Sequence, residues 1–285
     1  MKIGIGLPNQ VRDLRPTVIP EWATRAESLG FSSLATTGRI AYPGVMDTVA
    51  LAAAAGATTR IGLISTILVG PVWPAALLAK EAAGIDGVSG GRLTLGLGVG
   101  TDQRPDDFVA DGQPHRGRGR RLDADVEIYR EIWQGKPVGG DNPAVPRGTR
   151  EIPLLFGAFA PAAYARMARL GQGYIGPSAP APMALGAFEM ARAAWKDAGR
   201  SGAPRLVAVS YFAFGDPGAG HANVHDYYSM LGSQSAAAMA SGVQSATEAL
   251  RETVRIYADA GIDELIFNPA TDDIDDVSRL AEAVL

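Results

Sequence analysis

The sequence contains no cysteine, which excludes disulfide bonds, thiolate nucleophiles and thiolate-bound metals. It has only three histidines, His115, His221 and His225, so a histidine that acts as a general acid or base must be one of these. The formal net charge is −4, and no basic run is long enough to follow a phosphate backbone, so we expect no nucleic-acid partner. No apolar run reaches membrane-spanning length and the N-terminus does not resemble a signal peptide, so we expect a cytoplasmic protein without membrane contact.

Short β-rich runs alternate with longer segments of helical periodicity along the whole chain. The predicted strands are residues 3–7, 33–36, 61–69, 92–101, 152–157, 173–177, 205–215 and 264–269. The predicted helices are residues 17–29, 47–57, 75–88, 122–134, 161–171, 184–198, 247–260 and 274–284. Eight strands and eight helices in strict alternation predict one (β/α)8 TIM barrel, an α/β fold, as a single domain over residues 1–285. Residues 215–243 are expected to form an insertion loop after the seventh strand, over one end of the barrel.

The fourth predicted strand, "RLTLGLGVGT", places glycine at positions 96, 98 and 100. A dinucleotide fingerprint needs its glycines at the start of a helix, whereas these lie inside a strand and "TDQRPDD" after them is expected to break a helix. Alternate glycines instead keep one face of the strand clear for a close neighbour. That neighbour is either another layer of the barrel core or a flat ligand at the barrel mouth.

Several segments closely resemble the bacterial luciferase-like family of flavin- and deazaflavin-dependent oxidoreductases. The most specific of them is "LLAKEAAGIDGVSGGRLTLGLGVG", and the others are "RGRGRRLDADVEIYREIWQG", "IPLLFGAFAPAAYARMARLGQGYIG" and "AGIDELIF". The resemblance implies the same barrel, with reduced FMN or coenzyme F420 at the C-terminal mouth. It also implies a homodimer.

The resemblance further implies which residues hold the coenzyme. A strained or cis peptide at Thr66 and Ile67 would support the ring, and Gly98, Val99 and Gly100 would lie against the ring edge or the ribityl chain. Backbone amides of Gly157, Ala158 and Phe159 would bind the phosphate, which agrees with the preference of anions for a helix N-terminus, here the one that Pro161 begins. Gly176 and Ser178 would complete that pocket, although turn chemistry alone also explains them.

The chain departs from the family pattern at positions that matter for mechanism. After the second strand members often carry an acidic residue and a histidine, but this chain has Thr36, Thr37, Gly38 and Arg39. The catalytic candidates are therefore His115, His221 and His225, and we expect no metal site. Trp73, Tyr227 and Tyr228 are the candidate substrate-binding residues, although Trp73 also suits packing of a helix on the barrel. The segment that carries both tyrosines would form a mobile lid.

These features favour a flavin- or F420-dependent oxidoreductase that acts on a small organic substrate. With FMN we expect monooxygenation and a separate reductase as partner, and with F420 we expect hydride transfer. Two alternatives stay open: a non-catalytic flavin-binding relative, and a phosphate-binding barrel enzyme that acts on a phosphorylated metabolite without flavin.

Overall fold

The protein is a closed parallel barrel, seen here in a computed structural model that describes residues 1–102, 105–157 and 159–285. The eight barrel strands are β1 (Lys2–Gly6), β2 (Ser33–Thr36), β3 (Gly62–Ser65), β5 (Leu93–Gly98), β6 (Leu154–Gly157), β7 (Gly173–Ile175), β8 (Arg205–Phe212) and β10 (Glu264–Pro269). Every pairing between neighbours is parallel, and β10 pairs with both β1 and β8, which closes the ring. The TIM-barrel prediction is therefore confirmed.

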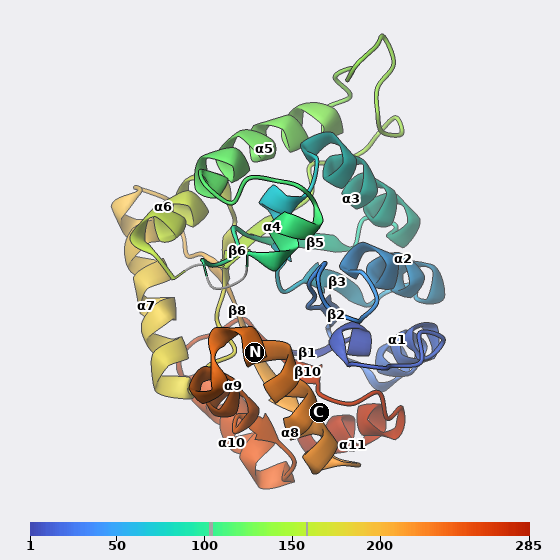
Figure 1. Ribbon diagram of the computed structural model, residues 1–285, viewed down its shortest axis with the longest axis vertical. Coiled ribbons are helices and arrows are strands. Elements are labelled where there is room, and N and C mark those ends of the chain that lie inside the picture. The colour runs from blue at the N-terminus through green and yellow to red at the C-terminus, as the bar shows by residue number, and fades with distance from the viewer. Residues whose placement is uncertain (103–104, 158) are drawn as a thin grey trace.

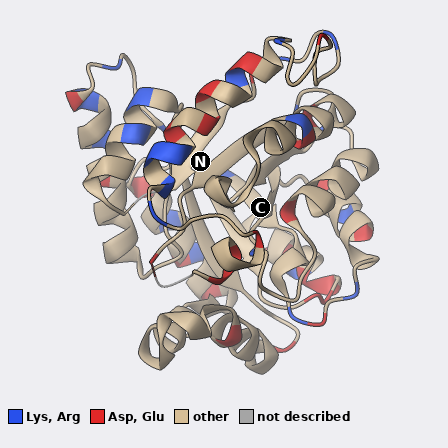
Figure 2. Cartoon of the chain, turned by 45° about the horizontal axis from the view of Figure 1, so that its top comes forward, with Lys and Arg blue, Asp and Glu red and all other residues tan. Residues whose placement is uncertain are grey.

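Eight helices surround the barrel, one after each barrel strand (Figure 1). They are α1 (Val18–Leu29), α2 (Asp47–Ala57), α3 (Ala75–Ser89), α5 (Arg118–Trp133), α6 (Pro161–Leu170), α7 (Ala181–Asp197), α10 (Thr247–Asp259) and α11 (Asp275–Val284). Local sequence sets several of their ends: α1 stops at Gly30, which adopts a left-handed φ of 94°, and α6 begins at Pro161. Figure 2 shows acidic and basic residues distributed over the helices that surround the barrel.

The barrel interior has a polar layer at its N-terminal end and an apolar layer above it. Arg205 donates to the carboxylate of Glu264 across 2.7 Å, and the hydroxyls of Ser32 and Ser33 donate to the same carboxylate. The apolar layer consists of Ala35, Ile64, Leu155, Ile175, Val207, Val209 and Ile266. The interior is thus filled by side chains, and ligands of this fold usually bind at the mouth.

The third predicted strand is interrupted in the structure. Residues 61–69 form β3 and the short β4 (Leu68–Val69), which pairs with β5 separately, and η2 (Gly70–Val72) follows. The peptide bond between Thr66 and Ile67 is cis and lies in the interruption. The apolar pattern of this run continues through the interruption, so periodicity alone predicted one strand.

Two predicted irregular segments are helical, which corrects the sequence prediction. Residues 215–243, called the insertion below, contain α8 (Pro217–Tyr228), η3 (Ser229–Leu231), α9 (Ser233–Ala240) and β9 (Val243–Gln244). The carboxylate of Asp216 caps α8 by accepting from the amide of Ala219 at 2.9 Å. An aspartate at this position is a signal for a helix start, but its neighbours Gly215 and Pro217 favoured the prediction of a loop. After β5, α4 (Asp106–Ala110) begins where a helix break was expected, because two acidic residues occupy its first turn. A further short turn of helix, η1 (Pro8–Gln10), follows β1.

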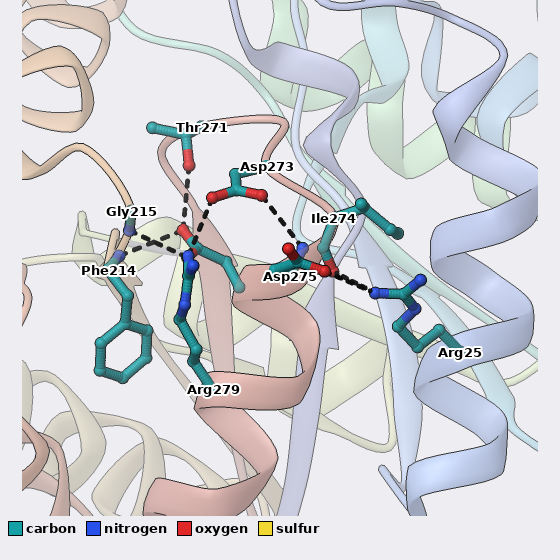
Figure 3. Close-up of polar contacts among 9 residues, drawn as sticks. Arg25, Phe214, Gly215, Thr271, Asp273, Ile274, Asp275 and Arg279 are labelled. Carbon is teal, nitrogen blue, oxygen red and sulfur yellow. Dashed lines mark hydrogen bonds and ion pairs between the residues drawn. The ribbon is translucent and has the colours of Figure 1, made fainter.

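The start of the insertion is fastened to the first turn of α11 (Figure 3). The buried carboxylate of Asp276 accepts from the amides of Phe214 and Gly215 at 3.1 and 3.0 Å and from the hydroxyl of Thr271 at 3.1 Å. Arg279 donates to Asp276 at 2.8 Å and to Asp273 at 2.9 Å. The insertion therefore leaves the barrel from a fixed point.

No helix in the described part of the chain is long and apolar enough to cross a membrane.

The ion pair at the N-terminal end of the barrel gives a stability prediction. Burial by itself raises the pKa of Glu264, but hydrogen bonds from Ser32, Ser33 and Arg205 hold it below its ordinary value of 4.5. Glu264→Gln should lower the free energy of unfolding by about 2 kcal/mol at pH 7, because Arg205 loses its partner. The pair stabilises the fold above pH 4.5 and loses this effect as the pH falls through the lowered pKa, so the deficit should shrink in acid. Urea unfolding at several pH values measures it.

The matched control is Glu252→Gln, which removes a surface partner of Arg255 on α10. This variant should unfold within about 0.5 kcal/mol of the unchanged protein. A deficit for Glu264→Gln that stayed constant from pH 7 to pH 3 would contradict the role assigned to its charge.

Candidate functional site

Ile67 forms the centre of the floor of the barrel mouth. Its side chain packs against the apolar layer of the interior and lies between Gly98 of β5 and Gly157 of β6. A Cβ atom at Gly98 would clash with Cδ1 of Ile67, and one at Gly157 would lie 3.0 Å from the same atom. The two glycines are therefore required by the position of this one side chain.

Neutral polar groups surround this floor on the side of β2 and β10. The hydroxyl of Thr37 lies 3.1 Å from that of Thr66, which itself donates to the carbonyl of Thr36 at 3.0 Å. The amide of Asn268, at the end of β10, reaches the Thr37 hydroxyl at 3.5 Å. This Thr37–Thr66–Asn268 cluster contains neither a carboxylate nor an imidazole, so it can orient a ligand by hydrogen bonds but does not carry a group that titrates near neutral pH.

Asn9 and Asp47 support the loop after β2 from behind. Asn9 donates to the carbonyls of Thr37 and Val45, both at 3.1 Å. Asp47 is buried, and a Cβ at Gly38 would lie only 2.7 Å from its Oδ2, so glycine is needed there. Burial raises the pKa of Asp47 to about 6, and the carboxylate of Asp107 adds to the rise. Because Gly38 packs directly against this carboxylate, Asp47 helps to fix the position of the loop after β2.

Arg39 joins three elements at the rim of the mouth. Only 3% of its side chain is exposed, and its guanidinium lies 3.9 and 4.0 Å from the carboxylates of Asp106 and Asp107 in α4. On the other side it reaches Sδ of Met230 at 3.2 Å and the ring of Tyr227 at 5.9 Å, both in the insertion. Arg39, in the loop after β2, thus connects α4 to the insertion.

A second contact holds α8 on the rim. The carboxylate of Asp226 accepts from Arg12 at 2.7 Å and from the hydroxyl of Tyr42 at 2.8 Å. Burial by itself raises the pKa of Asp226, but these two donors hold it below its ordinary value. Burial and the same carboxylate raise the pKa of Tyr42 to about 12. At neutral pH the phenol is therefore protonated and donates a hydrogen bond to Asp226. The ring of Tyr42 also packs edge to face on that of Tyr227, 5.0 Å between centroids.

The structure does not bring the three histidines together. His115 lies beside the loop after β5, with Nε2 3.2 Å from the carbonyl of Thr101 and 3.7 Å from the carboxylate of Asp102. His221 and His225 share the exposed side of α8, and Nε2 of His221 lies 3.3 Å from the carbonyl of Val243. In the described part of the chain none of the three forms a hydrogen bond with the Thr37–Thr66–Asn268 cluster, and their catalytic roles stay predictions.

The glycines at 96, 98 and 100 each face a protein neighbour. The space beside Gly96 is filled by Ser65 and Ile175, and the space beside Gly98 is filled by Ile67. A Cβ at Gly100, whose φ is 69°, would lie 3.2 Å from Phe108 in α4. Packing within the barrel therefore accounts for this pattern, while contact of Gly98, Val99 and Gly100 with a ring stays a prediction.

The remaining predicted residues lie along the rim. Phe159 is 69% exposed just before α6, Gly176 lies against the ring of Phe188, and Ser178 lines a cavity together with Met239 and Gln244 of the insertion and its end. Ala158 lies outside the described residues. Trp73 is partly buried and packs against the core between helices and barrel, and its role in substrate binding stays a prediction. Tyr227 and Tyr228 lie in the insertion, and the hydroxyl of Tyr228 is 3.1 Å from that of Tyr211 at the end of β8.

Sequence reasoning missed Asn9 and Asn268 as residues of the mouth. Asn9 lies two residues after the predicted strand 3–7, and Asn268 lies near the end of the predicted strand 264–269. Polar residues at the C-terminal ends of strands in a (β/α)8 barrel lie at the mouth. Their position relative to the predicted strands was the signal that could have found them. Their contacts with Thr37 depend on the closed ring and are not written in any local pattern.

The model of the luciferase-like monooxygenase family matches residues 1–273. An uncharacterised protein of Mycobacterium tuberculosis is 34% identical over 177 residues, which is 52% of this chain and 61% of that protein. The chain thus matches about three fifths of the length of this curated relative.

Solved structures of low sequence identity share the fold over the whole chain. An F420-dependent secondary alcohol dehydrogenase in complex with an F420–acetone adduct has a TM-score of 0.76 at 17% identity, with 100% of this chain and 98% of that chain covered. The oxygenating constituent of 3,6-diketocamphane monooxygenase from Pseudomonas putida, in complex with FMN, has a TM-score of 0.71 at 16% identity, with 99% and 95% covered.

The contact of Asp226 with the rim gives a second prediction. Asp226→Ala removes the acceptor of both Arg12 and Tyr42, so amide hydrogen exchange in α8 and η3 should accelerate by about threefold to tenfold. Exchange in the barrel strands should not change. Mass spectrometry of peptides from residues 217–231 measures this.

Asp272→Ala is the matched control, because Asp272 pairs with Arg15 on the neighbouring loop at 3.8 Å. It should leave exchange in α8 unchanged. Equal acceleration in both variants, or none in Asp226→Ala, would show that Asp226 does not hold the insertion on the rim.

Proposed function

We propose, since the chain belongs to the luciferase-like monooxygenase family, that it is an oxidoreductase which uses reduced FMN or coenzyme F420 on a small organic substrate. The observation that carries the proposal is the neutral floor of the mouth, where Ile67 is flanked by two glycines and by the Thr37–Thr66–Asn268 cluster. Both coenzymes carry a planar tricyclic ring whose edge has hydrogen-bond donors and acceptors. An apolar platform beside hydroxyl and amide groups is the kind of surface that such a ring fits.

The residues present suit this group in two further respects. Gly98 and Gly157 carry no side chain and Ile67 fills the space beside both, so this part of the floor presents one apolar side chain on which a flat ring could lie. The N-terminus of α6, with Pro161 in its first turn after Phe159, supplies the positive end of a helix for the coenzyme phosphate. Ile67 would lie under the ring, and the amide of Phe159 would bind the phosphate.

When bound, the reduced coenzyme supplies either a hydride or the electrons that activate oxygen. The protein itself holds and orients the ring through Thr37, Thr66 and Asn268, and it excludes water with the insertion, which Arg39 and Asp226 hold on the rim. No side chain of the floor cluster moves a proton at neutral pH. These residues therefore act by positioning the ring and the substrate.

Titration of the purified protein with FMN and with F420 tests the proposal. One of the two should quench in fluorescence as it binds, with a dissociation constant well below millimolar. Phe159→Pro removes the backbone amide assigned to the phosphate and should weaken binding by about tenfold or more, since a hydrogen bond to a charged group is lost. Phe159→Ala keeps the amide and is the control, because the exposed ring of Phe159 makes little packing.

Equal affinities of Phe159→Pro and Phe159→Ala would remove the phosphate assignment. If neither coenzyme bound while a sugar phosphate did, the flavin-free phosphate-binding alternative would replace this proposal. Binding of a coenzyme without turnover of any candidate alcohol, ketone or aldehyde would favour the non-catalytic alternative.

A further inference from the structure

Asp47 is a buried carboxyl group on which the loop after β2 rests. It is the first residue of α2, and a Cβ atom at Gly38 would lie 2.7 Å from its Oδ2 and 3.2 Å from its Oδ1. The backbone of Gly38 therefore packs on both carboxyl oxygens. The preceding residue is Thr37, whose hydroxyl belongs to the Thr37–Thr66–Asn268 cluster of the floor. A shift of Gly38 is thus passed to Thr37, because one planar peptide unit joins them.

Two further side chains brace the same loop. Oδ1 of Asn9 accepts from the amide of Thr37 at 3.4 Å, and Nδ2 of Asn9 donates to the Thr37 carbonyl at 3.1 Å. Asp107 of α4 accepts from the amide of Ala41 at 2.8 Å and lies 4.0 Å from the guanidinium of Arg39. The position of the loop therefore depends on Asn9, Asp107 and Asp47 together.

The surroundings of Asp47 favour its neutral form. Burial is the largest cause of the rise of its pKa to about 6, and the negative charge of Asp107 adds to the rise. Thr36 and Asn9 approach the carboxyl group and partly offset this rise. In the part of the chain that the structure describes, however, neither Oδ1 of Asp47 nor the Thr36 hydroxyl has a partner in hydrogen-bond geometry. A charge on Asp47 would therefore be buried next to a second carboxylate, with one oxygen unpaired.

The charged groups around Asp47 do not supply a counter-ion. Arg39, the cation of the same loop, lies 3.9 and 4.0 Å from the carboxylates of Asp106 and Asp107 in α4. β2 and η1 face Asp47 with the uncharged side chains of Thr36 and Asn9. Charged groups of the helices packed on α2 are engaged elsewhere: Glu27 of α1 with the amides of residues 59–61, and Asp86 of α3 with Arg150. None of these contacts brings a positive charge to the Asp47 carboxyl group.

We propose that Asp47 is a positioning residue of the coenzyme site: its neutral form keeps the Thr37 hydroxyl beside Thr66 and Asn268, and loss of its proton shifts the loop and weakens coenzyme binding. The inference rests on the proposed function, which assigns Thr37 to orient the coenzyme ring. The ionised carboxylate would be repelled by Asp107 and would seek a donor for its unpaired oxygen, and Gly38 is the backbone that lies against it. Binding of the coenzyme would in turn favour the protonated form of Asp47.

Titration of the full chain and of Asp47→Asn with FMN and with F420, between about pH 5 and pH 8, tests the inference. Asparagine has nearly the same shape as the neutral acid and cannot ionise. The affinity of the unchanged protein divided by that of Asp47→Asn should be near one at pH 5. It should fall about threefold to tenfold by pH 8, the range for one neutral hydrogen bond, because Asp47 ionises as the pH rises through about 6.

This ratio cancels the titration of the coenzyme's own phosphate, because that titration is common to both proteins. A ratio that stayed constant from pH 5 to pH 8 would overturn the role of Asp47.

Asp125→Asn is the matched control. Burial raises the pKa of Asp125 to about 6 as well, but this residue lies on α5, beside Tyr129 and Arg121. The affinity of the unchanged protein divided by that of Asp125→Asn should not change between pH 5 and pH 8. A fall as large as that for Asp47→Asn would overturn the assignment to Asp47.

Thr37→Ala separates positioning from direct repulsion between Asp47 and an anionic coenzyme. This variant should bind more weakly at every pH, and in its background Asp47→Asn should no longer alter the pH dependence. If the full effect of Asp47→Asn persisted without the Thr37 hydroxyl, the positioning role would be overturned. Melting by circular dichroism at each pH checks that the variants fold.

Amide hydrogen exchange without coenzyme separates this inference from the proposed function. Peptides from residues 36–45 should exchange about threefold to tenfold faster in the unchanged protein than in Asp47→Asn at pH 8, and equally fast at pH 5. This difference without affinity for either coenzyme would overturn the proposed function and leave only the hold of Asp47 on the loop. Coenzyme binding without a difference in either measurement would overturn the inference and leave the proposed function standing.

Discussion

Pairing of β10 with both β8 and β1 is the constraint on which the rest of the structure depends. This closure turns eight parallel strands into a ring, so their C-terminal ends meet at one mouth. It brings Asn268 of the last strand within reach of Thr37 after the second strand, 231 residues earlier in the chain. It also fixes how much space is left above the apolar layer, because Ile67 occupies the room that Gly98 and Gly157 leave free.

The floor and the rim of the mouth carry different kinds of polar group. The floor carries uncharged hydroxyl and amide groups, whereas the charged side chains Arg39, Asp107 and Asp226 lie on the rim and bind one another or the insertion. A ligand on this floor would therefore be oriented by hydrogen bonds to neutral groups. On the rim, the same charges serve to hold α4 and α8 in place.

The insertion has two different faces. One face carries Asp226, Tyr227 and Met230, which contact the rim near β1 and β2. The other end, with Met239 and Gln244, forms a wall of the cavity beside β8. Its first residues are held by Asp276 at the start of α11, so the insertion is fixed at its origin and at its contacts across the mouth. One segment thus both contacts the rim and lines this cavity.

The sequence by itself determined the alternation of strands and helices, the closed barrel that this count implies, and several helix ends such as those at Gly30 and Pro161, because these depend on local periodicity and on the backbone preferences of glycine and proline. It also identified the family through continuous segments. Only the tertiary structure decided that the insertion is helical, that Arg39 faces it, and that Thr37, Thr66 and Asn268 form one cluster. These contacts join residues that are far apart in the chain. Their distances are set by the closure of the sheet, which no local pattern of residues can predict.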